Sequence, residues 1–253
     1  MARTMPCVSQ VLAIPGLHTV RHLGGGAKSA VFAAVDVATG APLAVKMRLA
    51  ADVAAWTAAR FEGAALSASG HPALVRGTGP FADPAGRPYC RLSLVPGETL
   101  RARLWQRPAT TDEVVALARR LGAGLASLHR AGLAHGDLAP DNVMVPGGAV
   151  RRAVLLDLGS ARAFATPAGP ATLSYAAPEI RAGAPVSAAS DLYALGRLLR
   201  TALTGGAPPE PVPFMLAGAA NSLARVLDRW CAEDPDRRPD SVAKALEELT
   251  EIG

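Results

Sequence analysis

Residues 133–159 read LAHGDLAPDNVMVPGGAVRRAVLLDLG. Apolar runs flank a polar core that contains Asp137 and Asn142, and a second apolar run after the Gly-rich turn ends at Asp157. Short apolar runs separated by a turn predict a hairpin, which would hold these three polar side chains at one edge. Two carboxylates and an amide held together could position a hydroxyl group and bind Mg²⁺, because this hard cation prefers oxygen ligands. Taken alone, the same residues are also compatible with a solvated turn that carries incidental acids.

This stretch resembles the catalytic loop and the metal-binding loop of protein kinases. The run HGDLAPDN resembles the kinase pattern H-R-D-x-x-x-x-N, and DLG resembles D-F-G. The resemblance implies that Asp137 orients the attacking hydroxyl and accepts its proton. It also implies that Asp157 chelates the Mg²⁺ that bridges the β- and γ-phosphates of ATP, and that Asn142 holds a second ion.

A Gly-rich segment nearer the N-terminus resembles the kinase phosphate loop G-x-G-x-x-G-x-V. It lies within a strand–turn–strand unit expected at 19–37, with Gly24 and Gly26 in the first two glycine positions and Ser29 in the third. Backbone N–H groups approach phosphates closely where no Cβ intervenes. The resemblance therefore implies a nucleotide-binding loop formed by Leu23, Gly24, Gly25, Gly26, Ala27, Lys28, Ser29, Ala30 and Val31.

The next hairpin carries a lysine in a kinase-like position. Lys46 ends the run LAVK, which looks like the kinase strand V-A-I-K. Asp52 is a plausible N-cap for a helix that runs to about Ser67, and Glu62 is the one glutamate in that helix. The resemblance implies that Lys46 binds the α- and β-phosphates and that Glu62 holds the lysine in place.

Strands expected at 73–78 and 88–95, joined by a turn at 83–86, complete a small antiparallel sheet. The end of the second strand stands where kinases place the hinge that binds adenine through its backbone. Position and apolarity predict the hinge residues Leu92, Ser93, Leu94 and Val95, with Leu92 lining the back of the pocket.

The chain beyond Pro96-Gly97 is predicted to be mainly helical, with an N-cap at Thr111 and another at Asp240 or Ser241. The expected helices cover 98–106, 111–130, 189–203, 221–232 and 240–250. Loops rich in Ala, Pro and Gly are expected at 160–174 and 205–213.

Three further motifs follow in the order that kinases have them. The run YAAPE at 175–179 resembles the end of the activation segment, with Thr172 in its threonine position. SDLYALG resembles the following helix, in which Asp191 would hold the catalytic-loop backbone. DPDRRP resembles D-P-x-x-R-P, which implies a structural ion pair between Arg238 and Glu179.

These ordered matches span residues 23–239, and the chain resembles the bacterial Hanks-type (eukaryotic-like) Ser/Thr protein kinases, as an HGD variant without the catalytic-loop lysine. The implied fold is α+β and bilobal. An N-lobe at 1–95 would combine an antiparallel sheet with one helix, and a C-lobe at 96–253 would be mainly helical. The implied reaction transfers the γ-phosphoryl group of MgATP to a Ser or Thr hydroxyl of a protein substrate.

Composition sets limits on other partners and settings. Half of the residues are hydrophobic and 19% are charged, which supports a sizeable core. The net charge of +5 is scattered in arginine pairs without interleaved aromatics, so we expect no nucleic-acid partner. No apolar run reaches the roughly 18 residues of a membrane span. The three cysteines (Cys7, Cys90 and Cys231) form no C-x-x-C motif, which favours a reducing cytoplasm.

Three departures from the kinase pattern affect the expected activity. Gly136 replaces the arginine that grips an activation-loop phosphate, so we expect activity that does not depend on loop phosphorylation. Ala139 replaces a lysine that neutralises the γ-phosphate, which should lower the rate unless another cation such as Arg162 substitutes. The stretch 205–221 is short and proline-rich where kinases build a substrate-docking helix, so we expect protein-substrate recognition to be reduced or unusual.

Two other functions stay open at this stage. A small-molecule phosphotransferase is one, because H-G-D-L-x-x-x-N also resembles the loop of aminoglycoside and choline kinases; the Glu179 and Arg238 motifs argue against it. A pseudokinase that acts as a nucleotide-gated binding module is the other. Ala139 favours it, whereas the complete set of phosphate- and metal-binding residues disfavours it.

Overall fold

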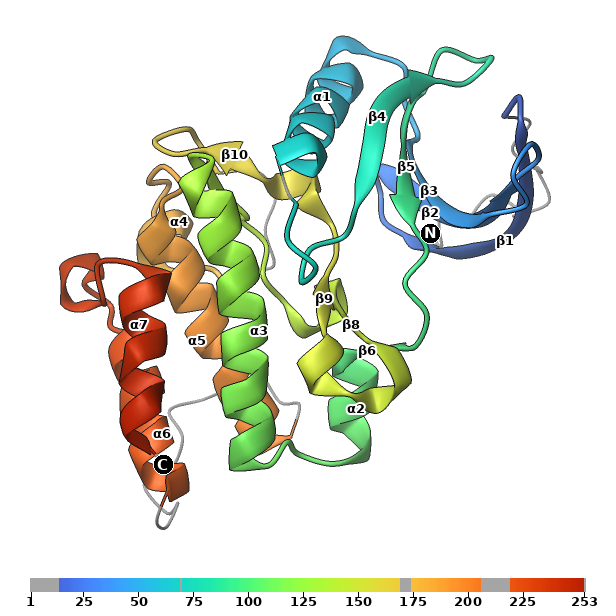
Figure 1. The fold of residues 1–253 in the computed structure, drawn as a ribbon. Helices are drawn as coiled ribbons and strands as arrows, with labels where there is room; N and C mark the ends of the chain where they lie inside the picture. Colours follow the sequence, from blue (N-terminus) through green and yellow to red (C-terminus); the bar gives the residue numbers. More distant parts are fainter. Residues whose placement is uncertain (1–13, 69, 169–173, 206–218, 253) are drawn as a thin grey trace, which may run out of the picture. The chain divides into compact units, whose positions relative to one another are not determined.

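The computed structural model describes residues 14–68, 70–168, 174–205 and 219–252 (Figure 1). The chain divides into two compact units, and the composition is α+β, as predicted. The first unit comprises Met1–Ser67 and Arg76–Leu94. The second comprises Ala68–Val75 and Val95–Gly253, so it takes in a short segment that the sequence prediction had placed in the N-lobe.

The first unit is a five-stranded antiparallel sheet with one helix. In spatial order its strands are β1 (Leu17–Gly25), β2 (Ser29–Asp36), β3 (Pro42–Arg48), β5 (Pro88–Ser93) and β4 (Gly77–Ala82). Helix α1 (Val53–Ala68) begins where predicted, because the Asp52 side chain accepts a hydrogen bond from the Ala55 N–H at 2.8 Å. The helix packs close to β4, where a Cβ on Gly63 would lie 2.3 Å from the Gly79 carbonyl oxygen.

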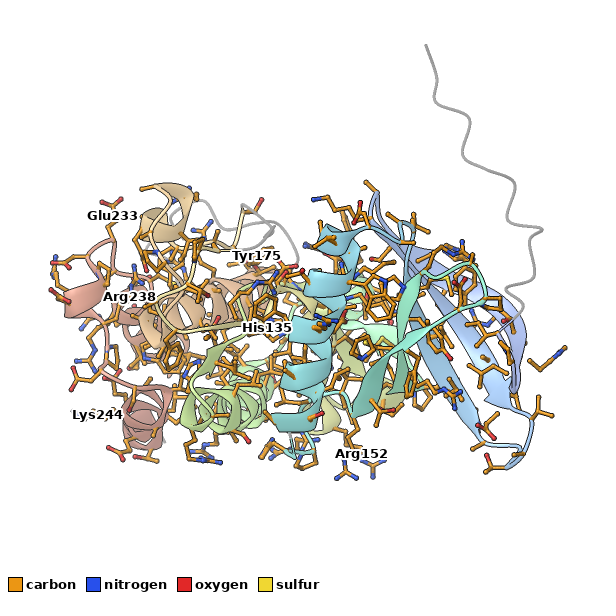
Figure 2. The ribbon with its side chains drawn as sticks, turned by 90° about the horizontal axis from the view of Figure 1, so that it is seen from above. His135, Arg152, Tyr175, Glu233, Arg238 and Lys244 are labelled. Carbon is orange, nitrogen blue, oxygen red and sulfur yellow. The ribbon has the colours of Figure 1, made fainter. Side chains whose placement is uncertain are left out.

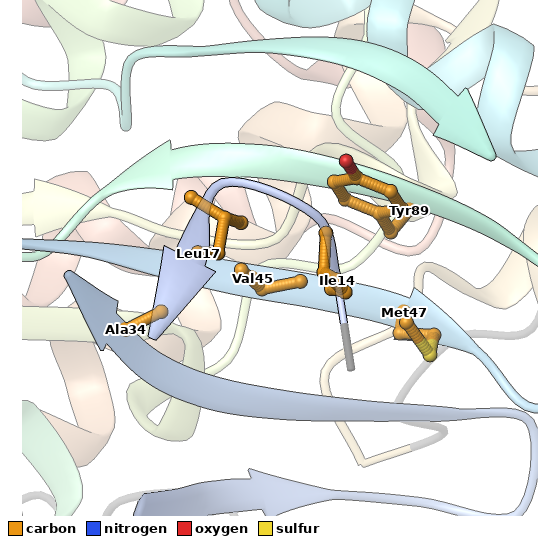
Figure 3. Close-up of a cluster of buried hydrophobic side chains, with 6 residues drawn as sticks. All are labelled: Ile14, Leu17, Ala34, Val45, Met47 and Tyr89. Carbon is orange, nitrogen blue, oxygen red and sulfur yellow. The ribbon is translucent and has the colours of Figure 1, made fainter. Parts of the chain in front are cut away.

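One face of this sheet carries an apolar cluster (Figure 3). Its buried members are Ile14, Leu17, Ala34, Val45, Met47 and Tyr89. Successive side chains of a strand point to opposite faces. Since Val45 and Met47 point into the cluster, Lys46 and Arg48 of the same strand are directed to the opposite face.

The strand expected at 73–78 is wrong in its first four residues, because β4 begins only at Gly77. Leu74 instead forms a parallel bridge with Leu155, and the Val75 N–H donates to the Leu155 carbonyl at 2.9 Å. Leu74 and Val75 are both buried. A short apolar run predicts burial without showing which part of the chain will cover it. Here the run is buried within the second unit.

The second unit is built around helices. They are α2 (Leu100–Gln106), α3 (Thr111–Arg130), α4 (Pro178–Arg181), α5 (Ala188–Thr204), α6 (Ala219–Trp230) and α7 (Val242–Glu248). Helix α3 packs against α5 and α7 (Figure 1). Its apolar face is fully buried at Leu117, Leu121, Leu125 and Leu128. The short α4 has no counterpart among the expected helices; it begins with Pro178, a residue suited to the first helical position.

Short strands hold the connecting loops of the second unit. The hairpin expected within 133–159 forms between β8 (Val143–Val145) and β9 (Val154–Leu155), and β6 (Glu98–Thr99) lies on its other side. The first apolar run of that stretch does not join the hairpin. It forms β7 (Leu133–Ala134), which pairs with β10 (Arg162–Ala163). Single 3-10 turns are found at Pro140–Asn142, Pro146–Gly148, Val150–Arg152, Leu158–Ser160, Pro235–Arg237 and Leu249–Ile252.

Helix α3 starts with a capping box centred on Thr110, one residue earlier than the predicted cap at Thr111. The Thr110 hydroxyl accepts from the Glu113 N–H, and the Glu113 carboxylate accepts from the Thr110 N–H at 2.9 Å. Arg103 and Arg107 also donate to this carboxylate. The hydrogen bonds from Arg107 are the main reason that the pKa of Glu113 falls to about 2.

None of the helices in the described ranges has the length and apolarity that crossing a bilayer requires. The two described cysteines, Cys90 and Cys231, are free thiols. Burial raises the pKa of each thiol to about 12. Cys7 lies outside the described residues.

The capping carboxylate should make stability depend on pH. Its folded pKa lies below the unfolded value of 4.5, so Glu113 stabilises the fold fully above pH 4.5 and loses this contribution as the pH falls toward 2. We expect Glu113→Gln to lower the free energy of unfolding by about 1–3 kcal/mol at pH 7, and by progressively less below pH 4.5. Denaturant unfolding of wild type and variant across pH 2–7 measures the difference. The exposed Glu247→Gln serves as the control, and a constant gap at all pH values would contradict the prediction.

The thiols of the buried Cys90 and the partly buried Cys231 should resist alkylation in the folded protein, because their raised pKa keeps them protonated and only the thiolate attacks an alkylating reagent. At pH 8 we expect iodoacetamide to leave Cys90 and Cys231 unmodified until denaturant is added. Peptide mass spectrometry before and after unfolding checks this. Rapid modification of either thiol in native protein would show that its burial is not maintained in solution.

Candidate active site

The predicted pair of Lys46 and Glu62 is present in the first unit. The Lys46 Nζ donates to Glu62 Oε1 at 2.8 Å, and the side chains are only 6% and 2% exposed. Strand β3 directs the lysine away from the apolar cluster, and α1 supplies the glutamate from the facing side. A buried charge is costly unless it is paired, so each residue requires the other. The pairing is confirmed, while the role of the two residues in phosphate binding stays a prediction.

The Gly-rich turn joins β1 to β2 and closes with a hydrogen bond from the Gly26 N–H to the Ser29 carbonyl at 2.9 Å. At Gly25 a Cβ would lie 2.5 Å from that carbonyl oxygen, so the turn itself requires glycine there. At Gly26, by contrast, a Cβ would meet no protein atom within 4 Å, and the backbone has no positive φ. The packing of the turn therefore does not require glycine at position 26. Glycine at this position fits a loop whose backbone must approach a ligand closely.

The predicted hinge residues lie at the end of β5. Leu92 is buried and pairs with Ala44 of β3, whereas Ser93 exchanges hydrogen bonds with Arg76 through both its N–H and its hydroxyl. Leu94 and Val95 follow directly after the strand and are partly buried. Adenine binding by these residues stays a prediction.

In the second unit the catalytic loop is held by one buried carboxylate, that of Asp191 on α5. Asp191 accepts the N–H of His135 at 2.7 Å and that of Gly136 at 2.9 Å, and the His129 Nε2 lies 2.9 Å from its Oδ2. The predicted grip of Asp191 on the loop backbone is therefore confirmed. His135 is fully buried in this unit (Figure 2), and its ring nitrogens contact the Leu156 carbonyl and the Asp137 N–H.

The environment of Asp191 keeps it ionised. Burial alone would raise the pKa of this carboxyl, but the hydrogen bond and the charge of His129 outweigh it, together with the charge of His135 and the Gly136 N–H, and the net shift is downward. An ionised acceptor makes stronger hydrogen bonds than a neutral one. The loop backbone is therefore fixed by charge-assisted bonds.

Asp137 and Asn142 contact each other within this loop. The Asn142 Nδ2 donates to the Asp137 carbonyl at 2.9 Å and to its Oδ2 at 3.1 Å. The Asn142 carbonyl in turn accepts the Leu156 N–H at 2.7 Å, which ties the loop to the residue before Asp157. Because the amide nitrogen faces Asp137, the amide oxygen is the atom of Asn142 that could ligate a cation.

Asp157 occupies the left-handed region with φ +50°, directly after β9. Its Oδ1 accepts the Gly159 N–H at 2.9 Å, a local bond of the kind that lets aspartate adopt this conformation. Among the described residues, no group of three or more His, Cys, Asp or Glu side chains is arranged to hold a metal ion. The oxygen donors of Asp157 and Asn142 fit Mg²⁺ in a site where phosphate oxygens supply further ligands.

The glycine at position 136 has a conformational reason. Gly136 has φ +77°, and a Cβ there would lie 3.0 Å from the Ser160 carbonyl oxygen. A residue with a side chain would be strained in this conformation. Glycine thus lets the loop reach Asp191 without strain, at the position where kinases of the expected pattern carry arginine.

Position 139, where the kinase pattern has a lysine, is occupied by a small apolar side chain. Ala139 is buried, with 1% of its surface exposed. Arg162, the substitute considered from the sequence, donates to the carbonyls of Gly159 and Ala161 at 3.1 and 2.8 Å. Its guanidinium is therefore directed onto the backbone of the metal-binding loop.

The described part of the activation segment is tied to neighbouring backbone. The Phe164 N–H donates to the Gly132 carbonyl at 3.0 Å, and Ala165 and Thr166 exchange backbone hydrogen bonds with Val186 at 3.1 and 3.0 Å. Strand β10 adds its pairing with β7. Thr172 lies outside the described residues, as does most of the proline-rich stretch 205–221.

The predicted ion pair between Arg238 and Glu179 is present. Two guanidinium nitrogens donate to the two carboxylate oxygens at 2.7 and 2.9 Å, and the Arg238 side chain is fully buried. Arg238 also donates to the backbone carbonyls of Ala189 and Glu233 and lies over the Tyr193 ring. It thereby fixes the end of the activation segment to α5.

The sequence interpretation missed two arginines near these residues. Arg48 donates to the second oxygen of Glu62 at 3.1 Å. Arg101 donates to Asp141 in the catalytic loop at 3.0 Å and to the Tyr175 hydroxyl at 3.3 Å. The spacing of Arg48, two residues after Lys46 on one strand face, was a usable signal, whereas nothing in the sequence connects Arg101 with Asp141.

Comparison with known proteins agrees with this geometry. Residues 17–249 match the protein kinase domain family. The serine/threonine-protein kinase pkn2 of Myxococcus xanthus is 32% identical over 91% of this chain and 31% of its own length.

Two mycobacterial proteins are also similar to the chain. PknL of Mycobacterium tuberculosis is 35% identical over 74% of the chain and 48% of its own length, and PknB of the same organism is 30% identical over 91% and 42%. Both bear the name serine/threonine-protein kinase. The chain thus spans less than half the length of each of these relatives. It belongs to the protein kinase family, and the predicted relationship to bacterial Ser/Thr protein kinases is confirmed.

Proposed function

We propose that this chain transfers the γ-phosphoryl group of MgATP to Ser or Thr hydroxyls of a protein substrate. The observation that carries the proposal is the Asp137–Asn142 contact in a loop whose backbone is fixed by the buried Asp191. A rigid loop of this kind holds a carboxylate where it can orient a hydroxyl and accept its proton. The names of the similar proteins support a protein substrate.

Each unit contains residues with a proposed role in nucleotide binding. The backbone of residues 23–31 and the Lys46 ammonium bind the phosphates, and residues 92–95 bind the adenine through their backbone. Glu62 keeps the ammonium in place through the buried ion pair. Asp157 and Asn142 would hold Mg²⁺, which would neutralise charge on the phosphates.

Asp137 supplies the proton-accepting group. Its Oδ2 accepts a hydrogen bond from the Asn142 amide at 3.1 Å, which orients the carboxylate. As the hydroxyl oxygen bonds to phosphorus, its proton passes to Asp137 and the bond to the β-phosphate oxygen breaks. Without a lysine at 139, the developing charge lacks one cation, so we expect a modest rate.

A second function, nucleotide binding without transfer, is favoured by one observation, the buried alanine at position 139. A small-molecule phosphotransferase is less well supported. The Glu179–Arg238 pair anchors an activation segment, a feature that serves peptide substrates, and the similar proteins carry protein-kinase names.

Control by phosphorylation of the described activation segment is not part of this proposal. Gly136 offers no cation for a loop phosphate, and Ala165 and Thr166 are already fixed by backbone hydrogen bonds to Val186. An ordered segment gains little from an added phosphate, since ordering is what such phosphates commonly provide.

The carboxylate at 137 can be tested directly. We expect Asp137→Asn to lower phosphoryl transfer to generic protein substrates by about 10²–10⁴-fold, because it removes the proton acceptor and keeps the shape. Affinity for MgATP should change little, as Asp137 is not proposed to bind the nucleotide. Labelled ATP measures transfer, and calorimetry measures binding. The control is Asp112→Asn, at an exposed position in the first turn of α3. Label on added small molecules alone, or none with wild type, would contradict protein kinase activity.

Loop phosphorylation can be tested at Thr166, whose hydroxyl donates to the Ala163 carbonyl at 2.7 Å. We expect Thr166→Ala to keep the transfer rate within about twofold of wild type, as for most substitutions that touch no buried network. Initial rates, with mass spectrometry of the wild-type protein to locate phosphate, check this. A large loss of activity, together with phosphate on Thr166, would overturn the expectation.

A further inference from the structure

Arg48 shares the Glu62 carboxylate with Lys46. The lysine Nζ donates to Oε1 at 2.8 Å, and the Arg48 guanidinium donates to Oε2 at 3.1 Å. Arg48 stands two residues after Lys46 on β3, so the strand directs both cations to the same face. Each oxygen of the glutamate thus has its own cationic partner.

These three residues are largely shielded from solvent. The side chains of Lys46, Glu62 and Arg48 are 6%, 2% and 13% exposed. A buried carboxylate is costly unless it is paired, so Glu62 depends on its cationic partners.

The position of Arg48 links this group to the Gly-rich turn. Arg48 pairs with Ser29 across the β2–β3 ladder, and Ser29 is the residue that closes the turn. The following residue, Leu49, donates its N–H to the Lys28 carbonyl at 3.1 Å. The end of β3 therefore supports the same backbone that is proposed to bind phosphates.

We propose that Arg48 is a positioning residue for nucleotide binding. It holds Glu62 through the second oxygen, so that Glu62 stays in place and paired while the Lys46 ammonium donates to a phosphate. Without Arg48, movement of the Lys46 ammonium toward a phosphate would leave the buried Glu62 carboxylate less well paired. Nucleotide binding would then weaken the ion pair between Lys46 and Glu62. The inference rests on the proposed function in that Lys46 is taken to bind phosphate.

Binding measurements with matched variants test this role. Arg48→Met keeps the length of the side chain without its charge, and Arg48→Lys restores a charge. Arg60→Met, at an exposed position of α1, is the control. We expect Arg48→Met to weaken the affinity for MgATP by about tenfold, Arg48→Lys to recover most of the loss, and Arg60→Met to change nothing. Calorimetric titration with MgATP measures each affinity, and KM for MgATP should rise more than kcat falls.

A double-mutant cycle separates positioning from general stabilisation. If Arg48 acts through Glu62, then Arg48→Met combined with Glu62→Gln should weaken MgATP binding no further than Glu62→Gln alone. If the double variant instead weakens MgATP binding by the product of the two single effects, the inference is overturned. Thermal unfolding shows whether each variant is folded; should Arg48→Met fail to fold, the cycle is repeated with Arg48→Gln, which retains a donor.

The outcomes keep this inference apart from the proposed activity. If wild type binds MgATP but transfers no phosphoryl group, the kinase proposal fails and the affinities still decide the role of Arg48. If wild type transfers phosphate while Arg48→Met binds MgATP as tightly as wild type, the role of Arg48 is overturned and the kinase proposal stands. No binding of MgATP by wild type would overturn both.

Discussion

A single buried carboxylate, Asp191, determines the geometry of the catalytic loop. With 1% of its surface exposed, it must have partners, and it finds them in two consecutive backbone N–H groups and in the His129 ring. The requirement works in both directions: α5 cannot bury this charge unless the loop approaches, and the loop cannot keep its shape unless α5 is in place. The position of Asp137 is therefore set by the packing of a helix more than fifty residues later in the chain.

Two other charged side chains, Glu62 and Arg238, are also buried and also depend on a partner of opposite charge. Glu62 requires cations because α1 and β3 bury it, and Arg238 requires Glu179 because α5 and the segment around 233 enclose its guanidinium. Each ion pair joins elements distant in sequence. Removing one partner of such a pair leaves a buried charge without its partner, which is destabilising. Each pair therefore holds distant elements of its own unit together.

Much of the fold and site could be predicted from the sequence, because motif residues are placed by local patterns. The Gly-rich turn and the helix capped by Asp52 follow from turn chemistry and capping. The pairing of Lys46 with Glu62 and the contact of Asp191 with the catalytic loop were implied by the resemblance to protein kinases. The errors concern tertiary context. The strand expected at 73–78 loses its first four residues, of which Leu74 and Val75 pair with Leu155 inside the second unit. Arg101 was missed because a contact between side chains distant in sequence leaves no local pattern. Arg48 was missed although its spacing from Lys46 on one strand placed both side chains on the same face.

The glycine at 136 also constrains how this chain could change. An arginine at that position would have to adopt the left-handed backbone at a cost of about 1–2 kcal/mol and place its Cβ 3.0 Å from the Ser160 carbonyl. Replacing Gly136 with arginine, the residue that would bind a loop phosphate, would thus destabilise the fold before it could bring any regulatory benefit. A second change, for example one that moves the Ser160 backbone, would have to offset this loss of stability. Regulation by a loop phosphate at this position therefore needs more than one substitution.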